Sequence, residues 1–336
     1  MHSQREPITV ANASRLTRVR RFGPPASIKS WGQHLAFDSQ STLLLAMERT
    51  QPDRIRWWNL RGESDLPACS AEMPLSSEFC VLPGRELVVA VGEPDATAPA
   101  AWKKRLVALS TRDGSLRNEA PFPHFLSGMS ASADGSLLAM TVDDGKGLLW
   151  DVERWRSLRE MEAPPKNFYS QGCAISPDGR FIAAAQSQTP TDEGSGTLQL
   201  WDATTGATLC LLSGNDPYVW DVAFHPTEPL LAAGTGDNGI HVVDLEQRRI
   251  VRTFDAPRAW RLSFNPDGSL LVVAGDGPFF SVYRFDTGEC LFGHQDGNDE
   301  QTSSAAFSPD GAYVAWGQGD YTVGLWAVPY PSLEPR

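Results

Sequence analysis

The chain has 336 residues, 41% of them hydrophobic, which is enough to fill the core of one large domain or of two ordinary ones. Its 29 glycines and 25 prolines favour turns over long helices. The formal net charge of -12 argues against non-specific binding to nucleic acid and to anionic membrane surfaces, because both depend on Lys and Arg. We therefore expect neither nucleic acid nor a membrane among its partners.

Neither the cysteines nor the first residues suggest secretion. The five cysteines are scattered, odd in number and without a C-x-x-C pair, so they predict no zinc site and no redox pair. Residues 1–10 lack the apolar segment of a signal peptide, and no apolar run approaches the roughly 20 residues of a membrane span. The expectation is a reduced, cytoplasmic protein with no metal and no cofactor.

The first candidate element is a basic segment, Arg15–Phe22, with the sequence RLTRVRRF. It resembles a later segment, Arg248–Phe254 (RRIVRTF), which reads as an outer strand. A basic outer strand is therefore favoured over a nucleic-acid-binding arm.

A single turn recurs along the rest of the chain. Its clearest copies are Ile175–Gly179, Phe264–Gly268 and Phe307–Gly311, which read Ser/Asn-Pro-Asp-Gly after an apolar residue. Proline presets the first turn position, aspartate bonds to the local backbone, and glycine accepts a positive φ. With weaker copies included, the landmark residues that precede the turn are Phe37, Val81, Ala131, Ile175, Phe224, Phe264 and Phe307.

Each turn joins two predicted strands, and a second landmark follows them. An apolar residue next to aspartate ends the third strand, at Trp150-Asp151, Trp201-Asp202 and Val243-Asp244. A fourth strand comes next, as at Thr208–Leu212 and Ile250–Phe254. The unit of four strands repeats about every 40 to 50 residues.

One stretch of this pattern could be read differently. Gly234, Gly236 and Gly239 fit G-x-G-x-x-G, the pattern of a dinucleotide-binding turn that precedes a helix. The next segment, Ile240–Asp244, is rich in β-branched residues and predicts a strand. The glycines are therefore predicted to turn one strand back onto the next.

The repeat length, the SPDG-type turn and the Trp-Asp dipeptide together resemble the WD40-repeat family. This resemblance implies an all-β, seven-bladed β-propeller with four antiparallel strands per blade, forming a single domain over residues 1–336. It also places Trp150, Trp201 and Trp326 in the core. The blades are expected roughly at residues 27–68, 73–122, 123–163, 164–212, 213–254, 255–294 and 295–328.

The two ends of the chain are expected to meet in the last blade. Three prolines follow Trp326 and cannot continue a central strand, so blade 7 lacks its outer strand. Residues 15–22 are predicted to supply it, which removes an open edge and ties both ends into one ring.

Two predicted hairpins are longer than the others, Gly92–Trp102 in blade 2 and Gln186–Thr197 in blade 4. A propeller places such hairpins on the face at which the innermost strands begin. They are either tolerated surface insertions or elements that help to hold a partner.

Motifs for catalysis are sparse. The chain contains no P-loop, no G-x-S-x-G and no H-E-x-x-H, and its six histidines are scattered without metal-ligand spacing. Asp144, Asp237 and Asp320 share one hairpin position, where WD40 proteins commonly place the aspartate of a hydrogen-bonded tetrad, so they are predicted to be structural. Glu78 and Asp221 begin innermost strands, where an acidic ring could bind a cation.

The candidate binding residues are mostly aromatic. They stand six or four residues before the landmark residues, at positions that open onto the narrower face of the propeller in this family. Interfaces concentrate large aromatic rings and Arg, although packing between blades could also use them. The predicted partner-binding residues are Trp31, Phe125, Tyr169, Tyr218, Trp220, Arg258 and Trp260.

These observations predict a non-catalytic interaction scaffold or assembly subunit that binds a protein partner on the narrow face, as part of a larger complex. One alternative is a propeller enzyme of hydrolase or lactonase type, which would use channel carboxylates and a metal. The other is a recognition module for a modified peptide or small ligand, in which Trp31, Trp220 and Trp260 would form an aromatic cage around a cation.

Overall fold

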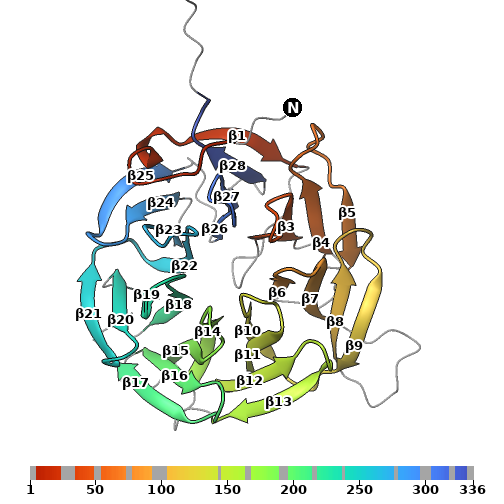
Figure 1. Ribbon diagram of the computed structural model, residues 1–336, viewed down its shortest axis with the longest axis vertical. Coiled ribbons are helices and arrows are strands. Elements are labelled where there is room, and N and C mark those ends of the chain that lie inside the picture. The colour runs from red at the N-terminus through yellow and green to blue at the C-terminus, as the bar shows by residue number, and fades with distance from the viewer. Residues whose placement is uncertain are drawn as a thin grey trace, which may run out of the picture.

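The computed structural model describes residues 5–23, 35–48, 54–72, 78–92, 104–142, 145–162, 168–188, 196–213, 218–236, 239–275, 279–295, 304–317 and 322–330. Within these ranges, 28 β-strands pair into seven four-stranded antiparallel sheets, and the one helical segment is a short 3-10 turn, η1 (Ala13–Arg15). The sheets stand around a central axis as the blades of a propeller (Figure 1). The predicted fold class is confirmed.

Each of the first three blades runs from its innermost to its outer strand in chain order. Blade 1 consists of β2 (Leu35–Phe37), β3 (Leu43–Glu48), β4 (Arg54–Asn59) and β5 (Cys69–Glu72). Blade 2 consists of β6 (Phe79–Leu82), β7 (Leu87–Gly92), β8 (Arg105–Ser110) and β9 (Leu116–Pro121). Blade 3 consists of β10 (Leu126–Ala131), β11 (Leu137–Val142), β12 (Lys146–Asp151) and β13 (Arg156–Met161). Strand β5 lies just after residue 68, where blade 1 was expected to end.

The next three blades repeat the arrangement. Blade 4 consists of β14 (Phe168–Ile175), β15 (Phe181–Gln188), β16 (Thr197–Asp202) and β17 (Thr208–Ser213). Blade 5 consists of β18 (Val219–Phe224), β19 (Leu230–Thr235), β20 (Ile240–Asp244) and β21 (Arg249–Phe254). Blade 6 consists of β22 (Ala259–Phe264), β23 (Leu270–Gly275), β24 (Phe279–Arg284) and β25 (Glu289–Gln295). Strands β19 and β20 confirm that the glycines near residue 236 connect two strands.

Blade 7 is assembled from both ends of the chain, as predicted. Its sheet contains β26 (Ala305–Phe307), β27 (Val314–Gly317), β28 (Val323–Ala327) and the N-terminal strand β1 (Thr17–Phe22). Strand β1 pairs antiparallel with β28, from Thr17 opposite Ala327 to Phe22 opposite Val323, and the two strands lie side by side in Figure 1. The buried Phe22 ring also packs against Trp58 of blade 1, with 5.5 Å between ring centroids.

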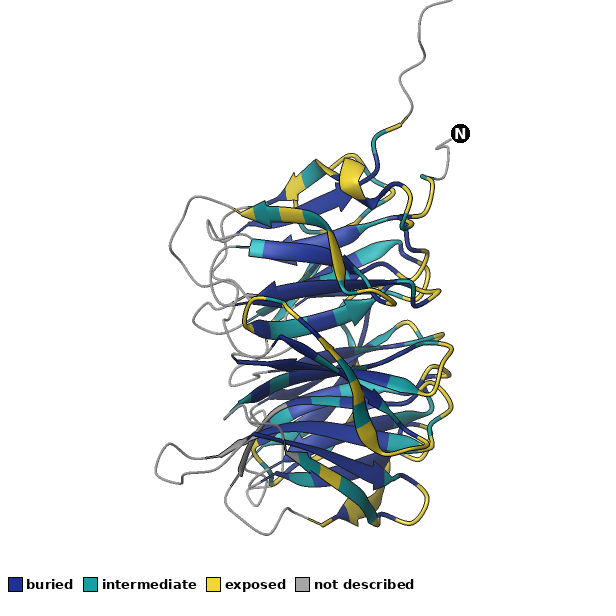
Figure 2. Cartoon of the chain, turned by 90° about the vertical axis from the view of Figure 1, so that its left-hand side faces the viewer, coloured by how far each residue is buried: buried dark blue, intermediate teal, exposed yellow. Residues whose placement is uncertain are grey.

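Burial follows the position of each strand within its blade (Figure 2). The middle strands are covered on both faces and are almost entirely apolar, as in β23, where every residue is buried. The outer strands, such as β9 and β13, are mostly exposed and polar. No helix among the described residues is long and apolar enough to cross a membrane.

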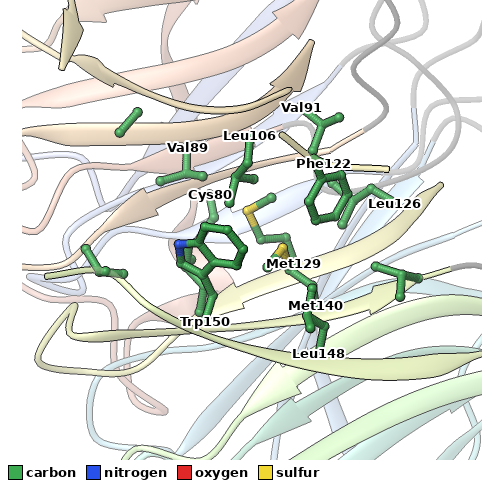
Figure 3. Close-up of a cluster of buried hydrophobic side chains, with 14 of the residues drawn as sticks. Cys80, Val89, Val91, Leu106, Phe122, Leu126, Met129, Met140, Leu148 and Trp150 are labelled. Atoms are coloured by element: carbon green, nitrogen blue, oxygen red, sulfur yellow. The ribbon is translucent and has the colours of Figure 1, made fainter. Parts of the chain in front are cut away.

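The core lies between neighbouring blades, because each blade buries its faces against the next. Figure 3 shows the cluster between blades 2 and 3, where Leu106 and Phe122 pack with Met129, Met140 and Trp150. Close packing of this kind provides the main favourable term in folding. The other two tryptophans of the Trp-Asp dipeptide positions are also buried, Trp201 completely and Trp326 to 6% exposure.

The recurrent turn is held by its polar residues. The hydroxyls of Ser132, Ser176 and Ser308 accept a hydrogen bond from the backbone N–H five residues later, at 2.9–3.0 Å. Each hydroxyl also donates to the aspartate two residues on, at 2.6 Å. In blade 3, hydrogen bonds from the Ser132 hydroxyl and from the N–H and hydroxyl of Ser136 lower the pKa of Asp134 to about 2. Ser and Asp thus hold the turn in blades 3, 4 and 7, Asn265 accepts the equivalent N–H bond in blade 6, and the turn glycines have positive φ values of 66° to 80°.

Candidate partner-binding site beside the central channel

The two faces of the ring differ in the chain segments that they carry. We call the face at which the innermost strands begin the upper face, and the face that carries the recurrent turns the lower face. Because adjacent strands are antiparallel, the turns between third and fourth strands also lie on the lower face. The predicted partner-binding residues stand at or just before the starts of innermost strands, so they belong to the upper face.

Irregular pairing marks the beginning of four innermost strands. The register shifts between Leu126 and Gly128, between Ser170 and Gly172, between Val219 and Asp221, and between Ala259 and Arg261. A β-bulge leaves one residue out of the ladder and changes the direction of its side chain. In blades 5 and 6 the residues inside the shifts are Trp220 and Trp260, two of the predicted binding residues.

Three aromatic rings meet at this place, and we call them the aromatic stack: Tyr218, Trp220 and Trp260. The rings of Tyr218 and Trp220 lie 5.1 Å apart and within 17° of parallel. The rings of Trp220 and Trp260 lie 5.2 Å apart and within 24° of parallel. All three side chains are half-buried. The stack therefore joins blade 5 to blade 6 and leaves part of each residue accessible.

The tryptophans of the aromatic stack do not form the predicted cage around a cation. A cation recognised by aromatic rings approaches a ring face to within about 6 Å of the centroid. Trp220 and Trp260 are in direct stacking contact, so no cation fits between them. Trp31, the third residue of the predicted cage, lies outside the described residues.

The other predicted binding residues have different surroundings. Phe125, just before β10, is 60% exposed, and the ammonium group of Lys104 lies 4.8 Å from its ring centroid. Arg258, just before β22, is exposed. Tyr169 lies in β14, with a side chain outside the described part of the structure. Of the seven residues predicted, the structure shows Tyr218, Trp220 and Trp260 in contact with one another.

An ion-pair cluster lies in the channel, and the sequence reasoning named its two carboxylates but missed its arginine. Arg261 of β22 reaches Glu78, just before β6, at 3.3 Å, and Asp221 of β18, also at 3.3 Å. Asp221 accepts a further hydrogen bond from the N–H of Leu262 at 2.9 Å. Burial raises the pKa of Asp221, and the Arg261 guanidinium acts in the opposite direction. Glu78 and Asp221 are therefore held by Arg261, not arranged as an open acidic ring.

The spacing of the repeats contains a signal for this ion-pair cluster. Glu78, Asp221 and Arg261 all stand three residues before a landmark residue, at the position occupied by Gly128 and Gly172 in blades 3 and 4. A Cβ atom on Gly172 would lie 2.5 Å from Asp221 Oδ1, so the glycine provides space for the carboxylate. The surrounding channel is an open cavity of about 570 Å³ whose lining includes Glu78, Asp221 and Arg261.

Two further groups concern the framework and not the site. His294 of β25 packs against Trp326 of β28 with 4.3 Å between ring centroids, a contact between blades 6 and 7. Asp144, Asp237 and Asp320 lie outside the described residues. Within the ranges that the structure describes, no three His, Cys, Asp or Glu side chains form a group that could hold a metal ion.

Comparison with known proteins finds one repeat that matches a family model and several proteins that are similar to part of this chain. The family described as WD domain, G-beta repeat, matches residues 206–244. Echinoderm microtubule-associated protein-like 2 of Rattus norvegicus is 28% identical over 60% of this chain. A probable cytosolic Fe-S cluster assembly factor of Schizosaccharomyces japonicus is 29% identical over 34% of the chain, and eukaryotic translation initiation factor 3 subunit I of Neurospora crassa is 34% identical over 22%.

These relatives are matched only in part. The aligned region covers 29% of the rat protein, 20% of the assembly factor and 21% of the initiation factor subunit.

Proposed function

Because this chain is a WD-repeat β-propeller, we propose that it is a non-catalytic scaffold or complex subunit that binds a protein partner at its upper face. The observation that carries the proposal is the aromatic stack at the bulges of blades 5 and 6. The proposal assigns no catalytic residue, and it includes a cytoplasmic location.

The chemistry of the stack supports a protein interface. Tyr and Trp are enriched in binding hot spots because they bury a large area at a low cost in conformational entropy. Stacking restricts the three rings before a partner arrives, which lowers the entropy lost on binding. Exposed Arg258, two residues before Trp260, adds a guanidinium group of the kind that interfaces also concentrate.

The relatives support the same kind of role. Their names describe a microtubule-associated protein, an assembly factor and a subunit of a translation initiation factor. The first name refers to microtubules and the third to a multi-subunit factor, and a propeller provides a rigid frame on which loops can vary. The identity of a partner is not transferred from any of them, because fold alone does not determine function.

A pull-down compares three forms of the protein. The binding variant is Tyr218→Ala/Trp260→Ala, and the control is Leu158→Ala/Leu211→Ala, which removes two exposed leucines from outer strands. Circular dichroism and thermal melting establish that both variants fold. We expect wild type and control to capture the same protein from a lysate of the native host and the binding variant to lose it. Equal capture by all three forms would place the partner elsewhere.

A further inference from the structure

Charge is distributed unevenly around the ring. Residues 1–122 contain 16 Lys and Arg against 13 Asp and Glu, whereas residues 123–336 contain 13 against 28. The first segment supplies β1 and all of blades 1 and 2, so it forms one continuous sector of the ring. This sector is therefore weakly basic, in contrast to the strongly acidic remainder of a protein of net charge -12.

A groove of about 740 Å³ lies in this sector, between blades 1 and 2 on the lower face. Its lining combines the first turns of both blades with their turns between third and fourth strands. Leu43 and Val81 contribute apolar surface above the buried Trp57, and Ser39, Gln40 and Thr42 contribute polar groups. The charged residues of the lining are Arg61, Arg85, Arg112, Asp38 and Glu86.

Arg61 is positioned by a local clamp. The guanidinium group of Arg20, on β1, donates to the carbonyl oxygens of Leu60, Gly62 and Ser64 at 2.8–3.2 Å. The N–H of Arg61 itself donates to the Asn59 side chain at 2.9 Å. The exposed Arg61 side chain is thus carried on an ordered turn, and within the described residues it has no carboxylate within 4 Å.

The other two arginines can exchange their partners at little cost. Arg112 pairs with Glu86, and both side chains are more than 60% exposed. Arg85 pairs with Glu153 of blade 3 at 3.1 Å, and this glutamate is 67% exposed. Exposed ion pairs contribute only about 0–1 kcal/mol, so carboxylates of a partner can replace them. Asp38 is already engaged, since it accepts bonds from the N–H groups of Thr42 and Leu43 at 2.6 Å.

We propose that this groove, lined by Arg61, Arg85 and Arg112, is a second docking surface that binds an acidic, carboxylate-rich peptide segment of a partner protein. Arginine recognises carboxylates through paired, directional hydrogen bonds, and the apolar lining can accept the side chains between them. The strong negative charge of the remaining blades disfavours a long polyanion such as nucleic acid, whose charge extends beyond one groove. The surface is separate from the aromatic stack, which lies on the upper face of blades 5 and 6.

Fluorescence anisotropy tests the proposal with a fluorescein-labelled peptide of alternating Glu and Gly, at physiological salt. A peptide of alternating Gln and Gly is the neutral reference. The groove variant is Arg61→Glu/Arg112→Glu. The control, Arg156→Glu/Arg249→Glu, changes the net charge equally at exposed sites of blades 3 and 5. Circular dichroism checks folding, and Arg61→Gln is a milder second variant.

The proposal predicts that the Glu peptide binds at least about tenfold more tightly than the Gln peptide. The groove variant should weaken binding more than about tenfold, and the control should change it less than about threefold. Equal weakening by both variants would show that only net charge matters, and equal binding of both peptides would show no carboxylate recognition. A single-stranded oligonucleotide that binds more tightly than the Glu peptide and depends on Arg61 would assign the groove to nucleic acid. Each of these three results would overturn the proposal.

Discussion

At the scale of the residue, His225 shows how one side chain connects two blades. It occupies the turn position held by serine in blades 3, 4 and 7 and by asparagine in blade 6, and its Nε2 lies 3.1 Å from the carbonyl oxygen of Gly268 in blade 6. Its Nδ1 accepts a hydrogen bond from the N–H of Glu228 at 2.9 Å, so the ring is neutral with its proton on Nε2. Burial lowers the pKa of His225 below its ordinary value of 6.5.

This lowered pKa predicts a specific pH dependence of stability. Below pH 6.5 the unfolded state binds a proton at His225 more readily than the folded state does. The free energy of unfolding therefore decreases as the pH is lowered from 6.5 to the pKa of His225 in the folded state. The slope from one such group is at most about 1.4 kcal/mol per pH unit. The His225→Asn variant, which copies Asn265 of the blade 6 turn, should lose this component. Urea unfolding at pH values above and below 6.5 measures it; identical pH dependence in both proteins would contradict the assignment.

Arg261 is the second residue whose contacts lead to a prediction. The side chains of Glu78 and Asp221 are both less than 10% exposed. Replacing Arg261 with methionine would therefore leave two buried carboxylates without their guanidinium partner. Breaking a buried ion pair on one side typically costs about 3–5 kcal/mol. The triple variant Glu78→Gln/Asp221→Asn/Arg261→Met should recover most of this loss. Denaturant unfolding measures both, and an Arg261→Met protein as stable as wild type would refute the role of the cluster.

At the scale of the element, strand β1 closes the ring. It completes the sheet of blade 7, and the segment before it buries Ile8 and Leu16 in the cluster between blades 6 and 7. Phe22, at its end, joins the cluster between blades 7 and 1. The strand therefore stabilises both interfaces of the last blade.

Deletion of residues 1–22 should lower the melting temperature by at least about 10 °C. It removes the buried side chains of Ile8, Leu16 and Phe22, each worth about 1.5–3 kcal/mol, together with the pairing to β28. Differential scanning calorimetry measures the change. The exposed substitution Arg18→Ala, on the same strand, is the control and should shift the melting temperature by less than about 2 °C. An unchanged melting temperature after the deletion would disprove the closure.

The elements were predictable because their signals are local and repeated. The landmark at Phe264–Gly268 and the proline-rich end after Trp326 depend on neighbouring residues, so the blade count and the closing strand followed from the sequence. The bulges at Trp220 and Trp260 and the parallel stacking of their rings depend on how two blades pack. That packing has no pattern within one repeat, so the sequence indicated the residues but not their arrangement.

At the scale of the whole molecule, the ring brings together residues that are far apart in sequence. Arg261 and Glu78 are separated by 183 positions and belong to blades 6 and 2, so their contact across the channel could not be predicted from either repeat alone. Similarly, the basic sector of β1 and blades 1 and 2 becomes a surface only when the ring closes. The rigid frame thus presents the aromatic stack on its upper face and the arginine-lined groove on its lower face.

The proposed function and the proposed groove together give two separate surfaces, each of which would bind a different segment without competing for the same residues. Their physical chemistry differs, because aromatic contacts depend weakly on salt and exposed charge contacts depend on it strongly. Binding at the upper face should therefore persist as ionic strength rises, while binding in the groove should weaken.

Hydrogen–deuterium exchange of the protein, alone and with the partner captured in the pull-down, tests the central claim most directly. The account predicts slower exchange in the complex at residues 218–221 and 258–261, where blades 5 and 6 begin on the upper face. It predicts unchanged exchange in the outer strands β9 and β13. Protection confined to outer strands or to the lower face, with no change at residues 218–221 and 258–261, would contradict it.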